Sequence, residues 1–235
     1  MTRLALSFAA VFLLTATVLV APAISFAAAT KSDDATRCHS LKGKDAAWAC
    51  LAAIKANPNS KSLRRRLGYA YLEADMFDAS IKAFRTVTTR WPNDWQGQFD
   101  LASVYGFLQA YPSAVAPIEA ALRIEPNNLQ SLMLATIIFR NVRRDDTVFR
   151  LALRAAGLGE RRAMFLTSYH YELGVGTKKD PARARHWMER AAAAGHVGAM
   201  DELTKGYLNG AMGFKPDARK AEFWATRARK ARNLQ

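Results

Sequence analysis

The chain has 235 residues, half of them hydrophobic, which is enough for one long helical array or two small domains. Its formal net charge of +14 at pH 7 favours nucleic acid, a membrane surface or an acidic partner, with a solvated basic surface as the alternative. The N-terminal residues indicate export, which argues against nucleic acid as the partner.

The first 27 residues are typical of a secretory signal peptide. A positively charged start precedes an uncharged, strongly apolar run over residues 4–20, and Pro22 ends that run. The small residues that follow predict cleavage after Ala27, or alternatively after Ala29, and hence a periplasmic or secreted protein. The run is long enough to span a bilayer, so an uncleaved membrane anchor is the alternative. Cleavage removes one cation and no acid from the charge of +14, which leaves +13.

The only two cysteines, Cys38 and Cys50, follow this segment. An even cysteine count in an exported chain favours a disulfide, which would close a small loop and contribute about 3 kcal/mol. We expect residues 28–43 to form a linker and a cap pinned by this disulfide, with a helix from about residue 44 to 56. No Cys-x-x precedes Cys38-His39, so a haem site is excluded, and no metal-ligand cluster lies nearby.

A three-residue turn signal then recurs every 34 residues, at 58–60, 92–94 and 126–128. In each triplet a proline is followed by Asn and then by Ser, Asp or Asn. Proline cannot continue a helix, and the third side chain can accept hydrogen bonds from the N–H groups that open the next one. The period therefore predicts stacked helical hairpins, the first two over residues 62–91 and 96–125.

The residues inside each period extend the pattern. Leu67-Gly68 and Tyr71 in one unit correspond to Leu101-Ala102 and Tyr105 in the next. This pattern resembles the tetratricopeptide repeat (TPR), and the resemblance, with a partial copy before and a degenerate copy after, covers residues 44–159. It implies an all-α fold, an α-solenoid of antiparallel helical hairpins, whose concave face binds peptides.

One stripe on the first helix of each hairpin would line that concave groove, because steps of three and four place its residues on one helical face. The alternative is that neighbouring helices bury some of them. The predicted partner-binding residues are Arg65, Tyr69, Phe99, Met133, Ile137 and Arg140.

The period changes after the glycines near residue 159. Tyr171, Gly174, Gly176 and Asp180, followed by an Ala-x-x-Trp that ends at Trp187, open a unit that recurs 36 to 37 residues later. This resembles the SEL-one-like repeat, a relative of the tetratricopeptide unit with a longer glycine-containing loop, and implies two such repeats over residues 160–235. Trp187 and its counterpart Trp224 are expected to plug the core between hairpins.

The last predicted helix, about 217–232, is strongly basic. A positive C-terminal end suits the helix dipole, and a polar last helix caps a solenoid. Contact with anionic lipid or polysaccharide is the alternative role. The basic face comprises Arg219, Lys220, Arg227, Arg229, Lys230 and Arg232.

No catalytic constellation is recognisable, and the histidines lack metal-ligand spacing, so we expect neither an enzyme nor a cofactor. The leading hypothesis is an exported adaptor that holds a protein or peptide in the bacterial envelope. A basic binder of anionic lipid or polysaccharide is the alternative. An enzyme acting on β-lactams or cell-wall material, proposed for some cysteine-rich SEL-one-like proteins, is disfavoured because the last repeats contain no cysteine.

Overall fold

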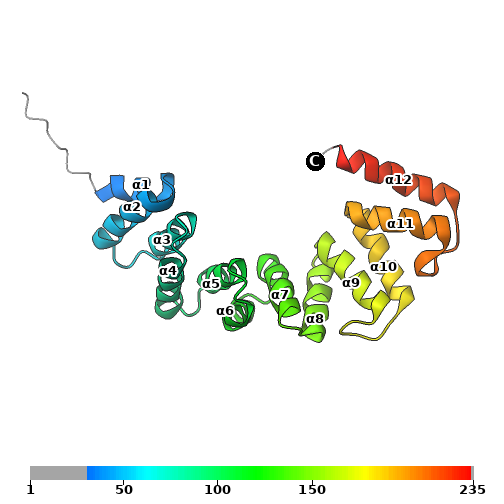
Figure 1. Cartoon of the computed structure of the whole chain (residues 1–235), viewed down its shortest axis with the longest axis horizontal. Coiled ribbons are helices and arrows are strands. Elements are labelled where there is room, and N and C mark those ends of the chain that lie inside the picture. The colour runs from blue at the N-terminus through cyan, green and yellow to red at the C-terminus, as the bar shows by residue number, and fades with distance from the viewer. Residues whose placement is uncertain (1–30, 234–235) are drawn as a thin grey trace, which may run out of the picture.

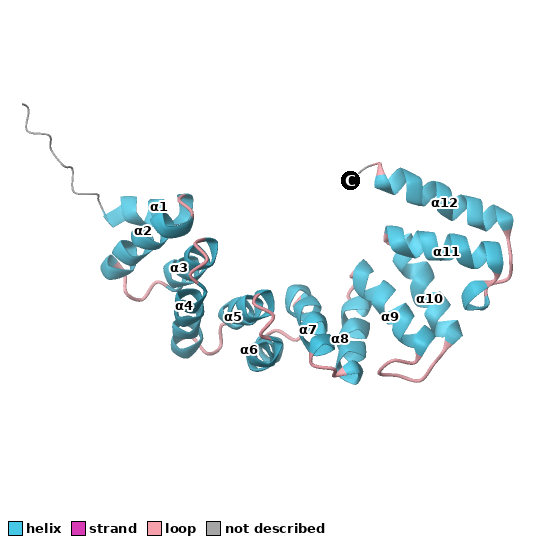
Figure 2. Cartoon of the chain, viewed as in Figure 1, coloured by secondary structure: helices cyan, strands magenta, loops and turns pink. Residues whose placement is uncertain are grey.

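A computed structural model of the chain describes residues 31–233, and every regular element in that range is a helix (Figure 2). The predicted all-α fold, an α-solenoid of antiparallel hairpins, is confirmed. The helices are α1 (Lys31–Ser40), α2 (Gly43–Ala56), α3 (Lys61–Glu73), α4 (Phe77–Arg90), α5 (Trp95–Phe107), α6 (Tyr111–Ile124), α7 (Leu129–Asn141), α8 (Asp145–Gly157), α9 (Arg161–Leu173), α10 (Pro181–Ala193), α11 (Val197–Asn209) and α12 (Ala218–Arg232).

The hairpins stack into an arc whose two ends turn toward the same side (Figure 1). In the N-terminal half, α3 and α5 lie on the inner side of this arc, while α4 and α6 lie on its outer side (Figure 1). Each hairpin packs on the next, and α8 packs directly on α9, so the packing continues across the change of period near residue 159.

The recurrent triplets do what their chemistry predicts. Ser60, Asp94 and Asn128 are the N-caps of α3, α5 and α7. Each side chain accepts a hydrogen bond from the backbone N–H three residues later, at 3.3, 3.0 and 2.9 Å respectively. A cap of this kind stabilises a helix by about 1 kcal/mol, and the period therefore sets where each hairpin begins.

Small residues let the paired helices approach. A Cβ on Gly68 would lie 2.5 Å from the ring carbon Cζ of Phe84, which is fully buried. The hydroxyl of Ser80 donates to the carbonyl oxygen of Gly68 at 2.8 Å across the same contact. The glycine of the Leu-Gly pair is therefore required by the close packing of α3 on α4.

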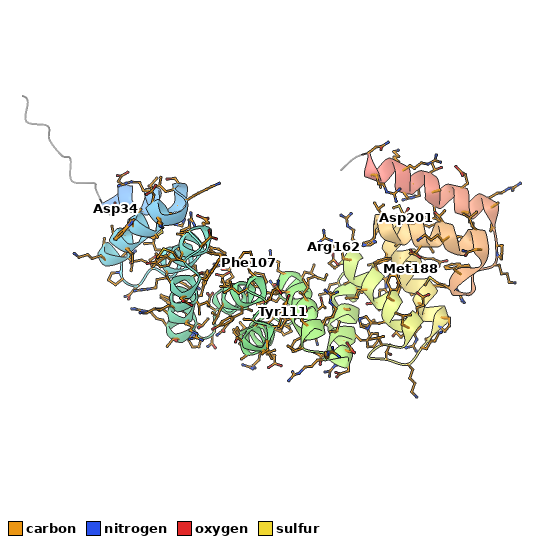
Figure 3. The ribbon with its side chains drawn as sticks, in the orientation of Figure 1. Asp34, Phe107, Tyr111, Arg162, Met188 and Asp201 are labelled. Carbon is orange, nitrogen blue, oxygen red and sulfur yellow. A yellow bond between two sulfur atoms is a disulfide. The ribbon has the colours of Figure 1, made fainter. Side chains whose placement is uncertain are left out.

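The C-terminal helices share a continuous core. Met188, which Figure 3 labels, is fully buried within it. Trp187 and Trp224 are half-buried and pack against this core, as expected from the sequence. In the last hairpin a short 3-10 turn, Ala211–Gly213 (η1), leads to Phe214, whose buried ring lies 4.7 Å from that of Tyr207.

The glycine loop of the α9–α10 hairpin closes onto the preceding hairpin. Gly174 takes the left-handed conformation that ends α9, with φ of 74°. Gly176, with φ of 68°, approaches α8 so closely that a Cβ there would lie 2.2 Å from the carbonyl oxygen of Asp145. The loop therefore joins the two kinds of repeat by backbone contact as well as by side chains.

At the N-terminal end, the structure joins Cys38 and Cys50 in a disulfide with an S–S distance of 2.01 Å, which confirms the predicted pairing. Both cysteines are fully buried between α1 and α2. The predicted signal peptide, residues 1–27, lies outside the described residues. Across residues 31–233, none of the helices combines the length and the hydropathy that a membrane span requires.

Candidate partner-binding surface

The predicted groove residues lie on the first helices of three successive hairpins, α3, α5 and α7. Their surroundings differ sharply. Arg65 and Tyr69 of α3 are engaged by a carboxylate of the next hairpin, whereas Ile137 and Arg140 of α7 are exposed. The stripe is therefore divided into a structural part and an accessible part.

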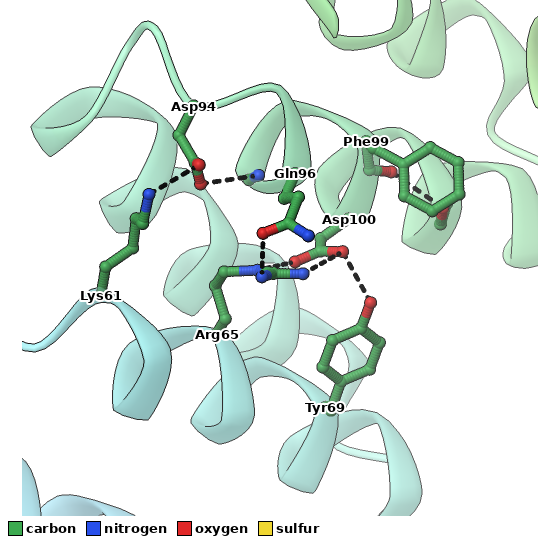
Figure 4. A network of polar contacts seen from close by, with 9 residues as sticks. Lys61, Arg65, Tyr69, Asp94, Gln96, Phe99 and Asp100 are labelled. Atoms are coloured by element: carbon green, nitrogen blue, oxygen red, sulfur yellow. Dashed lines mark hydrogen bonds and ion pairs between the residues drawn. The ribbon is translucent and has the colours of Figure 1, made fainter. Parts of the chain in front are cut away.

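The structural part centres on Asp100 of α5, whose side chain is 1 % exposed (Figure 4). Arg65 donates to it from Nε at 2.5 Å and from Nη2 at 3.2 Å, and donates from Nη1 to the amide oxygen of Gln96 at 2.8 Å. The hydroxyl of Tyr69 donates to the same carboxylate at 2.6 Å. Three hydrogen bonds to a buried charge, two of them from a guanidinium, link α3 to α5.

The electrostatics agree with this geometry. Burial, then the hydrogen bond and the charge of Asp100, raise the pKa of the Tyr69 hydroxyl well above its ordinary value. Burial by itself lowers the pKa of Arg65, but the hydrogen bond and the charge of Asp100 outweigh it and raise that pKa. Tyr69 therefore stays protonated as a donor, and Arg65 stays charged.

A second ion pair extends the same contact toward the start of both helices. Lys61 donates from Nζ to a carboxylate oxygen of Asp94 at 2.7 Å, while the other oxygen of Asp94 caps α5 (Figure 4). The carboxylate of Asp94 thus both caps the start of α5 and links the two hairpins through its ion pair with Lys61. Polar contacts from three successive turns of α3, at Lys61, Arg65 and Tyr69, therefore fix how α3 lies on α5.

The accessible part of the stripe lies over α5 and α7. Phe99 is half-buried, with its ring edge-on to Trp95 at 6.2 Å, and Met133 is half-buried against the C-terminal core. The side chain of Ile137 is 44 % exposed. Arg140 is exposed and makes no ion pair with any residue of the described range 31–233. Apolar side chains bordered by a cation without an ion pair in the described range therefore remain accessible on α5 and α7.

The basic face of α12 is exposed but partly engaged. Arg229 pairs with Glu222 at 3.0 Å, and Arg232 pairs with Asp201 of α11. Arg227 lies over the ring of Phe223, 5.4 Å from its centroid. Lys220 is also paired with an acid, since its Nζ lies 4.0 Å from a carboxylate oxygen of Asp217.

Arg219 and Lys230 complete the basic face, and both are exposed. Within the part of the chain that the structure describes, neither forms an ion pair. Three of the six cations of α12 are therefore balanced by neighbouring carboxylates, whereas Arg219, Arg227 and Lys230 have no such partner within the described residues.

Sequence reasoning missed the role of Asp100. Its only signal is an acid in the middle of an otherwise uncharged helix, WQGQFDLASVYGF. Acids are almost never fully buried unless they are paired, so that isolated acid was a reason to look for a cation on the neighbouring helix.

Two histidines also have definite structural positions. Nδ1 of His170 lies 2.7 Å from the carbonyl oxygen of Val175, in the glycine loop. His196 is the N-cap of α11, and its Nδ1 accepts from the backbone N–H of Ala199 at 3.1 Å. Residues 31–233 contain no cluster of three or more His, Cys, Asp or Glu side chains suited to a metal ion.

The profile of the Sel1 repeat matches residues 161–196 and 205–233. The first range contains α9 and α10, and the second contains the end of α11 and α12. The C-terminal part of the chain therefore carries Sel1 repeats, as the resemblance implied.

Solved structures show the same architecture. A crystal structure of a Sel1 repeat protein from Oxalobacter formigenes superposes with a TM-score of 0.57 at 25 % identity, covering 80 % of this chain and 79 % of that one. YrrB, a TPR protein with an unusual peptide-binding site, superposes with a TM-score of 0.58 at 14 % identity, covering 80 % and 94 %. The fold is that of a Sel1- and TPR-like helical-repeat scaffold.

Among curated proteins, chitin synthase regulatory factor 2 of Schizosaccharomyces pombe is 29 % identical over 123 residues. The match covers 52 % of this chain and 21 % of the relative. The chain thus matches about a fifth of the length of that protein.

Proposed function

We propose that this helical-repeat scaffold is an exported adaptor that holds a protein or peptide partner on the inner side of its arc. The observation that carries the proposal is the accessible surface on α7, where Ile137 is 44 % exposed beside the unpaired cation Arg140. Solenoid proteins use extended concave surfaces of this kind for binding. The peptide-binding site of a TPR protein with the same fold adds support by analogy.

We limit the proposed groove to four of the six predicted residues. Arg65 and Tyr69 already satisfy Asp100, so a partner would have to break buried hydrogen bonds to use them. Phe99, Met133 and Ile137 offer apolar contact without that loss, and Arg140 is free to pair with an acidic group. The partner is accordingly expected to present an apolar side chain close to a carboxylate.

Crosslinking in the bacterial envelope followed by affinity purification tests this surface. Replacing Ile137 with Ala should weaken capture of the partner, because a central apolar anchor typically contributes about 2 kcal/mol. Leu158→Ala is the matched control, since Leu158 is 43 % exposed but lies beyond the end of α8. Equal capture by both variants would place the partner elsewhere.

Export has a separate test. The intact mass of the protein recovered from a bacterial periplasm should correspond to a chain that begins at Ala28 or Thr30. Full-length protein in the membrane fraction would identify the N-terminal segment as an anchor.

A second candidate function is contact with an anionic lipid or polysaccharide through α12. It is favoured by Arg219, Arg227 and Lys230, the exposed cations of that helix that form no ion pair within the described residues. Contacts between exposed charges are screened by salt, so moderate salt should release such a polymer but leave the apolar contact at Ile137 intact.

A further inference from the structure

Three hollows adjoin one another around α4, the outer helix of the first TPR-like hairpin. The first, of about 340 Å³, is lined by Trp48 and Leu51 of α2 together with Tyr71 and Met76. The second, of about 350 Å³, shares Tyr71 with the first. The third, of about 870 Å³, shares Lys82 with the second and extends to Tyr105 of α5. These three adjoining hollows are together called the outer surface.

The end of the outer surface nearest α2 is apolar and open. Trp48 is 73 % exposed, and Leu51 and Met76 are each 41 % exposed. Soluble proteins rarely expose large apolar side chains next to one another, and where they do, the patch often marks an interaction site. Tyr71 lines both this hollow and the adjoining one.

The other end is cationic. Arg64, Lys82, Arg85 and Arg90 line the second and third hollows, against a single acid, Asp78. Across residues 31–233, none of these four cations forms an ion pair.

Their hydrogen bonds go to uncharged groups. Arg85 donates to the hydroxyl of Tyr105 at 2.6 Å, and Arg64 donates to the carbonyl oxygen of Pro58 at 2.7 Å. Nε of Arg64 is buried and has no acceptor in the described residues. Four cations held beside one another without a carboxylate favour an anionic partner.

We propose that the outer surface docks an acidic amphipathic segment of a partner protein, with its apolar side chains against Trp48 and its carboxylates along Lys82 and Arg85. A simple anion would leave the apolar end unused, and a purely apolar segment would leave the cations unpaired. A second copy of this chain is also a poor match, since its Lys and Arg residues outnumber its Asp and Glu residues by 34 to 20. An amphipathic helix presents both chemistries on adjacent faces, as helix-in-groove recognition requires.

This surface is separate from the one proposed on the inner side. The outer surface is built from α2, α3 and α4 with a single side chain of α5, whereas Ile137 and Arg140 lie on α7. An adaptor with two such surfaces could hold two partners at once. The experiment must therefore report on the two surfaces independently.

The probe is a labelled synthetic peptide of about four helical turns, with Leu and Phe on one face and Glu on the other. Its affinity is measured by fluorescence anisotropy. Trp48→Ala and Lys82→Glu should each weaken binding about tenfold or more, through loss of an aromatic anchor and of a complementary charge. Both side chains are exposed, so circular dichroism should show unchanged helix content in both variants.

Two control variants make the same chemical changes at the far end of the array. Phe223→Ala removes an aromatic ring that is 51 % exposed on α12, and Lys230→Glu reverses an exposed, unpaired cation. Both should leave the affinity within about twofold of the wild type. Ile137→Ala should also leave it unchanged, which separates this test from that of the inner surface.

Several results would overturn the proposal. No binding at about 1 mM peptide would do so, as would equal weakening by Lys230→Glu, which would mean attraction by net charge alone. Weakening by Ile137→Ala would place the peptide on the inner surface. Phosphatidylglycerol vesicles that bind the protein, lose affinity on Trp48→Ala and Lys82→Glu and displace the peptide would identify a lipid surface as the occupant.

Discussion

The contact between Arg65 and Asp100 gives the most direct test of how the hairpins are held together. Replacing Arg65 with Met keeps the aliphatic part of the side chain but removes the guanidinium. Asp100, 1 % exposed, then keeps only the hydrogen bond from Tyr69. Breaking a buried ion pair from one side typically costs about 3–5 kcal/mol. Because Arg65 is itself 23 % exposed, water can partly replace it, and we expect the free energy of unfolding to fall by about 2–3 kcal/mol.

Urea unfolding followed by circular dichroism measures this loss, and native-state hydrogen exchange locates it. Since each repeat contacts only its neighbours, exchange should accelerate most in α3 and α5. The control is Arg229→Met, which breaks the exposed pair with Glu222 and should change stability by less than about 0.5 kcal/mol.

A double variant separates the lost pair from the orphaned charge. Adding Asp100→Leu to Arg65→Met removes the unpaired carboxylate and should recover most of the loss, leaving about 1 kcal/mol. The reasoning is refuted if Arg65→Met alone is as mild as Arg229→Met. It is equally refuted if the double variant is less stable than the single one.

Three further changes test other parts of the fold. Burial lowers the pKa of His196, so the folded state favours the neutral ring that caps α11. The free energy of unfolding should be highest above the ordinary pKa of 6.5 and fall as the pH drops through the lowered pKa, which urea midpoints measured at decreasing pH would show; His196→Asn should abolish this dependence. Gly176→Ala should lower the free energy of unfolding by about 1–3 kcal/mol, and with it the melting temperature, because the added Cβ would lie 2.2 Å from the carbonyl oxygen of Asp145. The control is Gly157→Ala, whose added Cβ would have no atom within 4 Å and should not lower the melting temperature. Equal melting temperatures for the two variants would refute the loop contact. Cys50→Ser should lower the stability of the α1–α2 hairpin by about 3 kcal/mol, seen as faster hydrogen exchange there, and unchanged protection would show that the disulfide is dispensable.

Much of the fold could be predicted because its signals are local. The 34-residue period, the proline that ends one helix and the Ser, Asp or Asn that caps the next act within a few residues of each other, and the structure places the caps at Ser60, Asp94 and Asn128. The disulfide was predictable for a related reason, since its two cysteines are 12 residues apart and have no competitor. Helical periodicity also placed the groove residues on the first helices of their hairpins.

What those residues do was decided by tertiary structure. Periodicity places Arg65 and Tyr69 on the same face as Ile137, but it carries no information about which neighbour lies opposite. Asp100, 35 residues after Arg65, turns part of the predicted binding stripe into a buried link between hairpins, while Ile137 meets no such partner and stays accessible. The outer surface has the same origin, because Trp48, Tyr71 and Lys82 come from three helices that only stacking brings together. The amino-acid sequence by itself determined the helices, their caps and the order in which they stack, since these follow from interactions between near neighbours. Which charges are buried and which apolar side chains remain open depends on contacts between distant residues, and only the folded array decides them.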